Sequence, residues 1–258
     1  MTKPVRRILV TNDDGINAPG LKAAIKIANV LSDDIWVVAP MEEKSGASHS
    51  LSLTQPLRLI KKGGQKYAVT GTPTDCVMFA TRHMLRDDPP ELVLSGINFG
   101  QNIAEDVSYS GTVAAAKEGT VFGIPSVALS QAISLDSRHK IRFEVGVKHG
   151  SSIIRKLLKL DWPQDTLMNI NFPDIDPDAR CRVRITKQGK RDARILRLEE
   201  RIDPRNNSYY WYDFKRESIN AGKGTDIEAI LEGDISITPL KMDHTDTGTK
   251  RKLSALFG

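Results

Sequence analysis

The chain has 258 residues, of which 40% are hydrophobic and 27% charged, as in an average soluble protein with room for one large or two small domains. It carries 37 Lys and Arg against 32 Asp and Glu, a formal net charge of +5. No apolar run reaches the ~18 residues that a transmembrane helix needs, and the apolar stretch near the N-terminus is too short for a signal peptide. Cys76 and Cys181 lie too far apart for a CxxC metal site, so we expect two reduced thiols in a cytoplasmic protein.

The positive charge is unevenly distributed. Residues 1–130 hold 13 basic and 13 acidic side chains, whereas residues 131–258 hold 24 and 19. The segment 180–201 alone has nine basic and three acidic residues. Such a local excess can form a solvated face, lie at a subunit interface, or attract a polyanion.

The first part of the chain alternates between strand-like and helix-like segments. Residues 7–11 form a short apolar run that ends in an Asn-Asp-Asp-Gly turn. Residues 21–31 have apolar side chains at helical spacing, and residues 35–39 form a second apolar run. This β-α-β order predicts a mostly parallel sheet that is covered by helices.

The same alternation continues along the chain. The further elements that we expect are a hairpin near 51–61 and 66–69, a helix at 72–85, strands at 91–95 and 125–129, helices at 111–121 and 141–160, and strands near 167–171, 181–186, 205–213 and 234–238. We predict a single α/β domain, in which residues 1–179 form a core with helices on both faces of the sheet. Residues 180–258 are expected to form a strand-rich C-terminal extension.

Polar clusters follow three of the expected strands. Ligands of open α/β sheets bind outside the carboxyl ends of the strands, so these clusters can converge on one site. The clusters are Asn12, Asp13, Asp14 and Gly15 after the first strand, Lys44 to Ser50 after the second, and Ser95 to Thr112 after the strand at 91–95.

The adjacent carboxylates of Asp13 and Asp14 suggest a cation site. Two like charges at the end of a buried strand repel each other, and Mg²⁺ or Mn²⁺ bound by oxygen ligands would relieve that repulsion. Ser45 and Asn98 can supply neutral oxygens, and the absence of paired His or Cys argues against zinc. The alternative is that Asn-Asp-Asp-Gly is only a turn.

Ser110, Gly111 and Thr112 open an Ala-rich helix. Backbone N–H groups and hydroxyls at a helix N-terminus can bind phosphate, although ordinary N-capping by Ser110 explains the same residues. The chain has neither a P-loop nor a GxGxxG motif, so dinucleotide binding is not supported. A cation next to a phosphate site favours hydrolysis of a phosphate ester by water.

His49 follows Ser48 in the second cluster and could assist catalysis. No GxSxG motif accompanies it, which argues against a serine hydrolase. A structural, hydrogen-bonding role is more typical of a single histidine in a loop.

Six segments together resemble the survival protein SurE family of metal-dependent nucleotidases. They occur in the family's order over about 120 residues. The matching segments are residues 8–15, residues 38–40 with 44–46 and 49–50, residues 71–77, residues 95–98 with Gly100 and Asn102, residues 110–113, and residues 123–126.

The resemblance implies a Rossmann-like core and hydrolysis of nucleoside 5′- and 3′-monophosphates, in some members also of short polyphosphate. It implies one divalent cation, Mg²⁺ or Mn²⁺, per subunit. The family's metal ligands fall on Asp13, Asp14, Ser45 and Asn98, of which Asp13, Asp14 and Asn98 are the expected catalytic residues. Its phosphate-binding positions fall on Asn102, Ser110, Gly111 and Thr112, and Ser108 is a weaker match. It also implies a homodimer or homotetramer formed through the C-terminal extension.

Two other functions are compatible with the sequence. Residues 180–201 could bind nucleic acid, although aromatic residues are only 6% of the chain and no nucleic-acid-binding motif is present. A protein with the same phosphate site could also sense nucleotides without hydrolysing them. Nucleic acid and membranes are not the partners that we expect.

Overall fold

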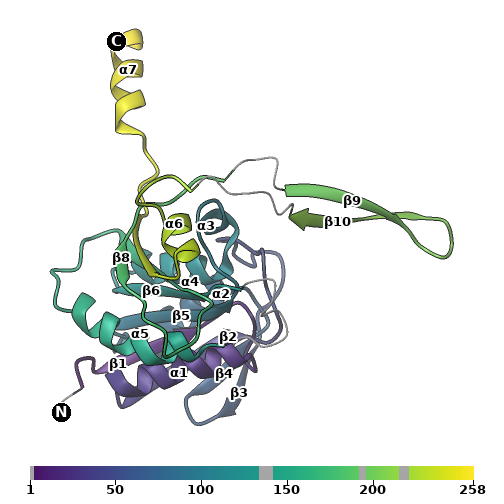
Figure 1. The fold of residues 1–258 in the computed structure, drawn as a ribbon. Coiled ribbons are helices and arrows are strands. Elements are labelled where there is room, and N and C mark those ends of the chain that lie inside the picture. The colour runs from purple at the N-terminus through teal and green to yellow at the C-terminus, as the bar shows by residue number, and fades with distance from the viewer. Residues whose placement is uncertain (1–2, 134–141, 192–195, 215–220) are drawn as a thin grey trace.

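The computed structural model describes residues 3–133, 142–191, 196–214 and 221–258. Its centre is a nine-stranded sheet with the strand order β3-β4-β2-β1-β5-β6-β7-β11-β8 (Figure 1). The strands are β1 (Arg7–Thr11), β2 (Asp34–Pro40), β3 (Leu59–Gly63), β4 (Lys66–Val69), β5 (Leu92–Phe99), β6 (Ser126–Gln131), β7 (Thr166–Phe172), β8 (Val183–Ile185) and β11 (Ile235–Lys241). Neighbouring strands are parallel except in the pairs β3–β4 and β7–β11. The predicted α/β fold with a mostly parallel sheet is therefore confirmed.

Helices cover both faces of this sheet because its strands are apolar on both sides. Ile8 and Val10 of β1 belong to one buried cluster with residues of α1 and α5, whereas Leu9 belongs to a second cluster with residues of α2 and α4. All three side chains are fully buried. The helices concerned are α1 (Pro19–Leu31), α2 (Pro73–Phe79), α4 (Gly111–Val121) and α5 (Glu144–Leu157).

Helix α2 begins at the capping residue that the sequence predicts, Thr72. The Thr72 side chain accepts a hydrogen bond from the Asp75 N–H, and the Asp75 side chain accepts one from the Thr72 N–H, which forms a capping box. After Phe79 the backbone continues as a π-helical segment, η1 (Ala80–Met84), so this helical region ends close to the expected residue 85.

The elements next to the polar clusters differ in part from the prediction. β5 continues to Phe99, four residues beyond the expected end, and carries Asn98 on the strand itself. The expected loop that follows contains a short helix, α3 (Asp106–Tyr109). Residues 51–58 form no strand, and the hairpin strand there begins only at Leu59.

The C-terminal part has two kinds of structure. β8 and β11 complete the main sheet, and α6 (Asp226–Leu231) contacts β11. β11 joins the core because its Ile235 and Ile237 are buried in the same cluster as Ile170 and Phe172 of β7, and β8 pairs with β11 at the edge of the sheet. In contrast, the hairpin of β9 (Leu196–Ile202) and β10 (Ser208–Phe214) and the terminal helix α7 (Thr247–Phe257) project away from the body (Figure 1).

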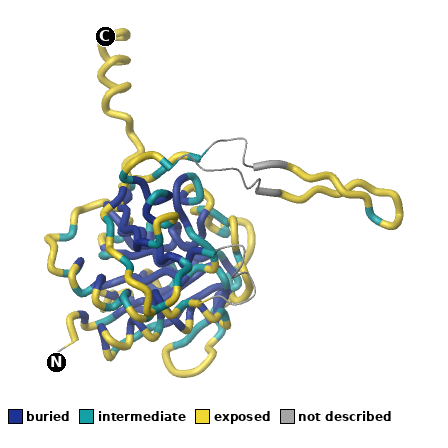
Figure 2. Tube along the Cα trace, viewed as in Figure 1, coloured by how far each residue is buried: buried dark blue, intermediate teal, exposed yellow. Residues whose placement is uncertain are grey.

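Exposure follows this division. Figure 2 shows a largely buried sheet and two exposed projections, and α7 has no buried residue. Cys76 is buried and Cys181 partly buried, and both are free thiols. Among the described residues, no helix is long and apolar enough to cross a membrane.

Candidate functional site

The three polar clusters meet at the carboxyl ends of β1, β2 and β5. β1 and β5 are parallel neighbours with Thr11 in register with Ser95, so the residues that follow them lie side by side. The Phe99 N–H donates to Asp14 Oδ2 at 3.2 Å, which joins the first cluster to the third. The Lys44 N–H donates to the Asp13 carbonyl at 2.8 Å, which joins the first cluster to the second.

Asp13 lies against the N-terminus of α4. Its side chain is buried, and its Oδ1 accepts a hydrogen bond from Thr112 Oγ1 across 99 residues of sequence. Burial raises the pKa of the Asp13 carboxyl above its usual value, while hydrogen bonds from the side chain and backbone of Thr112 lower it. The first turn of α4 therefore supports the negative charge of this carboxylate.

Gly111 makes this close approach possible. A Cβ at Gly111 would lie 2.8 Å from Asp13 Cβ, 3.0 Å from Asp13 Oδ2 and 3.1 Å from Pro73 Cγ. These distances are shorter than ordinary van der Waals contact. The carboxylate and α4 can thus touch only because residue 111 has no side chain.

Asp14 has a strongly perturbed pKa. Burial and, to a smaller extent, the neighbouring Asp13 raise it to about 7, although the hydrogen bond from the Phe99 N–H opposes the shift. Glu43 adds further negative charge near both carboxyls. Among the described residues, no Lys, Arg or His forms an ion pair with Asp13 or Asp14.

The remaining donors of this site are neutral oxygens. Asn98 Nδ2 donates to the Gly100 carbonyl at 2.9 Å, which leaves Asn98 Oδ1 as the free end of the amide. Ser45 is exposed and donates to Glu43 Oε1 at 2.8 Å. The buried Asn12 Oδ1 has no hydrogen-bond partner. Unbalanced carboxylates with neutral oxygens around them fit a hard divalent cation such as Mg²⁺ or Mn²⁺.

A soft-metal site is not seen in the part of the chain that the structure describes. No group of three or more His, Cys, Asp and Glu side chains is placed there to hold a metal ion. The predicted oxygen set contains only two such residues, so this finding bears on zinc rather than on Mg²⁺ or Mn²⁺.

The expected phosphate residues lie in the loop after β5 and at the start of α4. Ser110 is buried and caps α4, with its Oγ accepting from the Val113 N–H at 3.0 Å. Asn102 is buried too, and its Nδ2 donates to Ser130 Oγ at 2.8 Å. Its N–H donates to Asn171 Oδ1 at 2.8 Å. The structure thus gives each of these side chains a structural contact. Ser110 precedes Gly111, which lies against Asp13, and Asn102 is bonded to Ser130, which pairs in register with Asn98.

The sequence reasoning missed the residues that support Asn102. Asn169 and Asn171 are fully buried on β7, and both donate to the Asn102 carbonyl, at 2.8 and 3.2 Å. The sequence contains a hint of this role, because two asparagines in an otherwise apolar strand need hydrogen-bond partners. Only the order of strands in the sheet shows that their partner is the Asn102 carbonyl, in the loop after β5.

His49 takes a structural contact. Its Nε2 lies 2.8 Å from Oε2 of Glu118, a buried carboxyl in α4. This pair connects the loop after β2 to α4, in line with the structural role that is typical of a single loop histidine.

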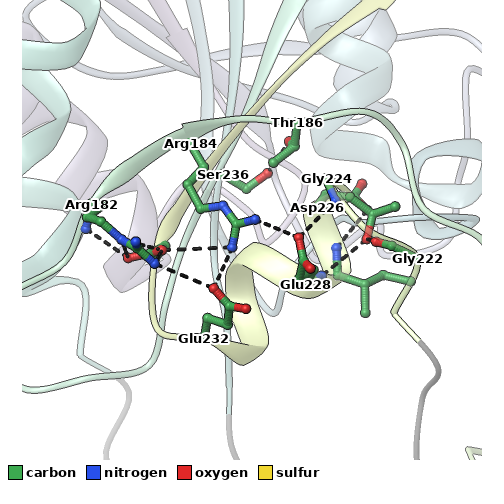
Figure 3. Close-up of polar contacts among 12 residues, drawn as sticks. Arg182, Arg184, Thr186, Gly222, Gly224, Asp226, Glu228, Glu232 and Ser236 are labelled. Carbon is green, nitrogen blue, oxygen red and sulfur yellow. Dashed lines mark hydrogen bonds and ion pairs between the residues drawn. The ribbon is translucent and has the colours of Figure 1, made fainter.

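Among the described residues, four of the nine basic side chains of segment 180–201 form ion pairs within the chain. Arg182 binds Asp234 at 2.7 Å, and Arg184 binds Glu228 at 2.5 Å and Glu232 at 2.6 Å (Figure 3). These pairs connect β8 to α6 and the start of β11. Two further arginines of the segment are paired, Arg191 with Asp106 and Arg201 with Glu199. The charge of these four arginines is therefore balanced within the chain, which reduces the positive charge that the segment offers to a polyanion.

Comparison with known proteins agrees with the six motifs. A family model described as "Survival protein SurE" matches residues 8–195. The chain belongs to the SurE family. The family identified from the motifs is thus confirmed.

Close relatives of this SurE protein are bacterial. It is 55% identical to the 5′-nucleotidase SurE of Parvibaculum lavamentivorans, over 98% of this chain and 91% of the relative. It is 53% identical to the 5′-nucleotidase SurE of Azorhizobium caulinodans, over 97% of this chain and 98% of that relative. The crystal structure of the SurE protein from Aquifex aeolicus superposes with a TM-score of 0.83 at 38% identity, covering 98% of this chain and 100% of that one.

Proposed function

We propose that this SurE protein is a divalent-cation-dependent 5′-nucleotidase, which hydrolyses nucleoside 5′-monophosphates to nucleoside and phosphate. The observation that carries this proposal is the adjacent pair of the buried Asp13, held against the N-terminus of α4, and the partly buried Asp14, neither of which has a cationic partner among the described residues. The names of the curated relatives support the same class of enzyme.

Each residue then has a defined part. Asp13, Asp14, Asn98 and Ser45 would hold one Mg²⁺ or Mn²⁺ ion. The bound cation would offset the charge of the phosphate group and lower the pKa of a water molecule. Thr112 opposes the rise in the pKa of Asp13 that burial causes, and its hydrogen bond fixes the orientation of the carboxylate.

The phosphate group would lie beside α4. Asn102, Ser110, Gly111 and Thr112 are the proposed phosphate-binding residues, because helix N-terminal N–H groups attract anions. Water would attack phosphorus as the bond from phosphorus to the ester oxygen breaks. One proton of the water passes to that oxygen, so that the nucleoside leaves as an alcohol, and the other remains on the released phosphate. We include nucleoside 3′-monophosphates and short polyphosphate among the proposed substrates, since the same cation and helix N-terminus would bind the terminal phosphate group of each.

The decisive experiment is the Asp13→Asn substitution. We expect phosphate release from AMP in the presence of Mg²⁺ or Mn²⁺ to fall by at least about a hundredfold, because the cation loses a charged ligand. Asp161→Asn removes a carboxyl from an exposed loop and serves as the matched control. Circular dichroism should show both variants folded.

Two results would contradict the proposal. One is full activity of Asp13→Asn with EDTA present. The other is nucleotide binding without any turnover by the wild-type protein with either metal, which would identify a nucleotide sensor instead.

We also propose that copies of the chain assemble into a dimer or tetramer through the C-terminal projections. Support comes from the β9–β10 hairpin, since an isolated two-stranded hairpin is only marginally stable in water. Leu198, Ile202, Tyr210 and Tyr212 of this hairpin are each 59% exposed or more. We place the protein in the cytoplasm, in agreement with its two free thiols.

A further inference from the structure

A hollow with aromatic walls adjoins Asp14, and neither the proposed cation site nor the proposed phosphate site occupies it. It has a volume of about 300 Å³ and is lined by Asp14, Glu43, Phe99, Phe143 and the first turn of α1. Small-molecule sites are typically concave, with aromatic walls and a few polar groups. The hollow therefore has the character of a binding site next to the reacting centre.

Phe99 has an exposed ring on a fixed backbone. It ends β5, pairs in register with Gln131 of β6, and its N–H is bonded to Asp14. Its side chain is nevertheless 46% exposed, which is unusual for a phenylalanine on a central strand. Its ring is thus held beside the site by the sheet and remains free to contact a ligand.

Phe143 forms a second, more firmly packed wall. It is partly buried against the main core cluster. A Cβ at Gly20 would come within 3.1 Å of Phe143 Cε1, so the ring lies close to the start of α1. The hollow therefore has one anchored ring and one accessible ring.

The charged groups around the hollow indicate which part of a nucleotide could enter it. No Lys, Arg or His is among the described residues that line the hollow, so its walls offer no positively charged side chain to a phosphate group. Thr112 and the N-terminus of α4 lie on the Asp13 side of the carboxylate pair and attract one. A nucleotide with its phosphate near α4 would point its uncharged part away from that helix.

We infer that this hollow binds the nucleobase of the substrate, with Phe99 as the residue on which the base stacks. This inference rests on the proposed nucleotidase function and adds to it a base-binding subsite. Stacking on an aromatic ring is available to every nucleobase, because each has a π-face. Phe99 would therefore favour nucleotides over sugar phosphates without strong selection among bases.

The test compares AMP with ribose 5-phosphate, which has the same phosphate ester and no base. We expect Phe99→Ala to raise the KM for AMP about tenfold, the range of one lost base–aromatic stack. The KM for ribose 5-phosphate should change less than about twofold. Phe99→Tyr retains the ring and should restore the AMP value. Thermal unfolding confirms that the variants are folded.

A competing site provides the control. Tyr109 is 64% exposed in the segment before α4 and is another ring that a base could contact. The inference is overturned if Tyr109→Ala, rather than Phe99→Ala, raises the KM for AMP. It is also overturned if Phe99→Ala affects both substrates equally or neither of them.

A measurement of AMP binding tests the base-binding hollow independently of the proposed nucleotidase function. Calorimetry measures AMP affinity without turnover, and Phe99→Ala should weaken it about tenfold. If the wild-type protein binds AMP through Phe99 but hydrolyses neither substrate, the nucleotidase function fails and the base-binding hollow stands. If both substrates are hydrolysed and AMP binding does not depend on Phe99, the hollow fails alone.

Discussion

At the scale of single residues, Thr112 controls the carboxylate on which the proposed chemistry depends. Burial opposes the charged form of Asp13, and the hydrogen bonds from Thr112 support it. A group that is hydrogen-bonded to a metal ligand, and not to the metal itself, commonly contributes 10–100-fold to metal affinity or activity. Thr112 is therefore a positioning residue with a measurable effect.

We expect Thr112→Val to reduce activity with Mg²⁺ or Mn²⁺ by about 10–100-fold. The variant keeps the side-chain shape but loses the hydroxyl that donates to Asp13. The measurement is phosphate release as a function of metal concentration. Thr120→Val is the matched control, since Thr120 is a buried threonine of the same helix that donates only to the Ala116 carbonyl. Equal losses in both variants would mean that the effect comes from the helix and not from Asp13.

Local sequence predicts the position of Asp13 and not its environment. The run Ile8–Val10 is buried as expected, and the carboxylates follow the strand. The contact with Thr112 spans 99 residues and arises from the packing of α4 against the sheet. The same holds for Asn102, whose partners on β6 and β7 become visible only once the strand order is known.

At the scale of elements, the distance between α4 and β1 is set by a glycine. The helix comes so close to the strand end that a methyl group at Gly111 would overlap Asp13 and Pro73. The clash involves Cβ of Asp13, which cannot move without the backbone. The position of the helix and that of the carboxylate are thus linked.

Gly111→Ala should therefore lower kcat/KM by about a hundredfold, the effect of a displacement near 1 Å at a catalytic group. Overpacking should also reduce the free energy of unfolding by about 1–3 kcal/mol. Gly248→Ala, in α7, is the control, because its Cβ would meet no atom closer than 3.6 Å. Kinetics and urea unfolding test both expectations, and an active, stable Gly111→Ala protein would refute them.

The sequence predicts the elements of the first 179 residues better than those that follow. Buried parallel strands give uninterrupted apolar runs, as in β1, β2 and β6. The sequence does not predict β9 because four of the seven residues in its Leu-Arg-Leu-Glu-Glu-Arg-Ile stretch are charged, so it has no apolar run like those of the buried strands. α6 was missed because it has only six residues and begins at a single cap, Thr225.

At the scale of the whole molecule, the β9–β10 hairpin has exposed apolar and aromatic side chains on one face, which the described residues of this chain leave uncovered. Tyr212 lies opposite Leu198, Tyr210 opposite Glu200 and Ser208 opposite Ile202, so these six residues share that face of the ribbon. Paired exposed apolar residues on a projecting ribbon are typical of interaction sites. The proposed partner is a second copy of the chain.

The double variant Leu198→Glu with Tyr212→Glu should reduce the mass of the assembly by at least a factor of two, because the new charges would be buried at the interface. Sedimentation velocity measures that mass. Val121→Glu is the control, since Val121 is 56% exposed at the end of α4, outside both projections. A wild-type protein that sediments as a monomer, or a variant that keeps its mass, would exclude the hairpin as an interface.

The position of β11 also affects the order in which the chain can fold during synthesis. β7 is fully buried and pairs with β11, which is completed only at Lys241, near the end of the chain. Until the ribosome has released that segment, β7 is an open and apolar edge, the kind of edge on which strands of other chains add. A chain that stops before Ile235 retains the proposed site residues, which all lie between Asp13 and Thr112, but lacks the strand that closes the sheet. Premature termination would thus yield an aggregation-prone fragment rather than a smaller enzyme.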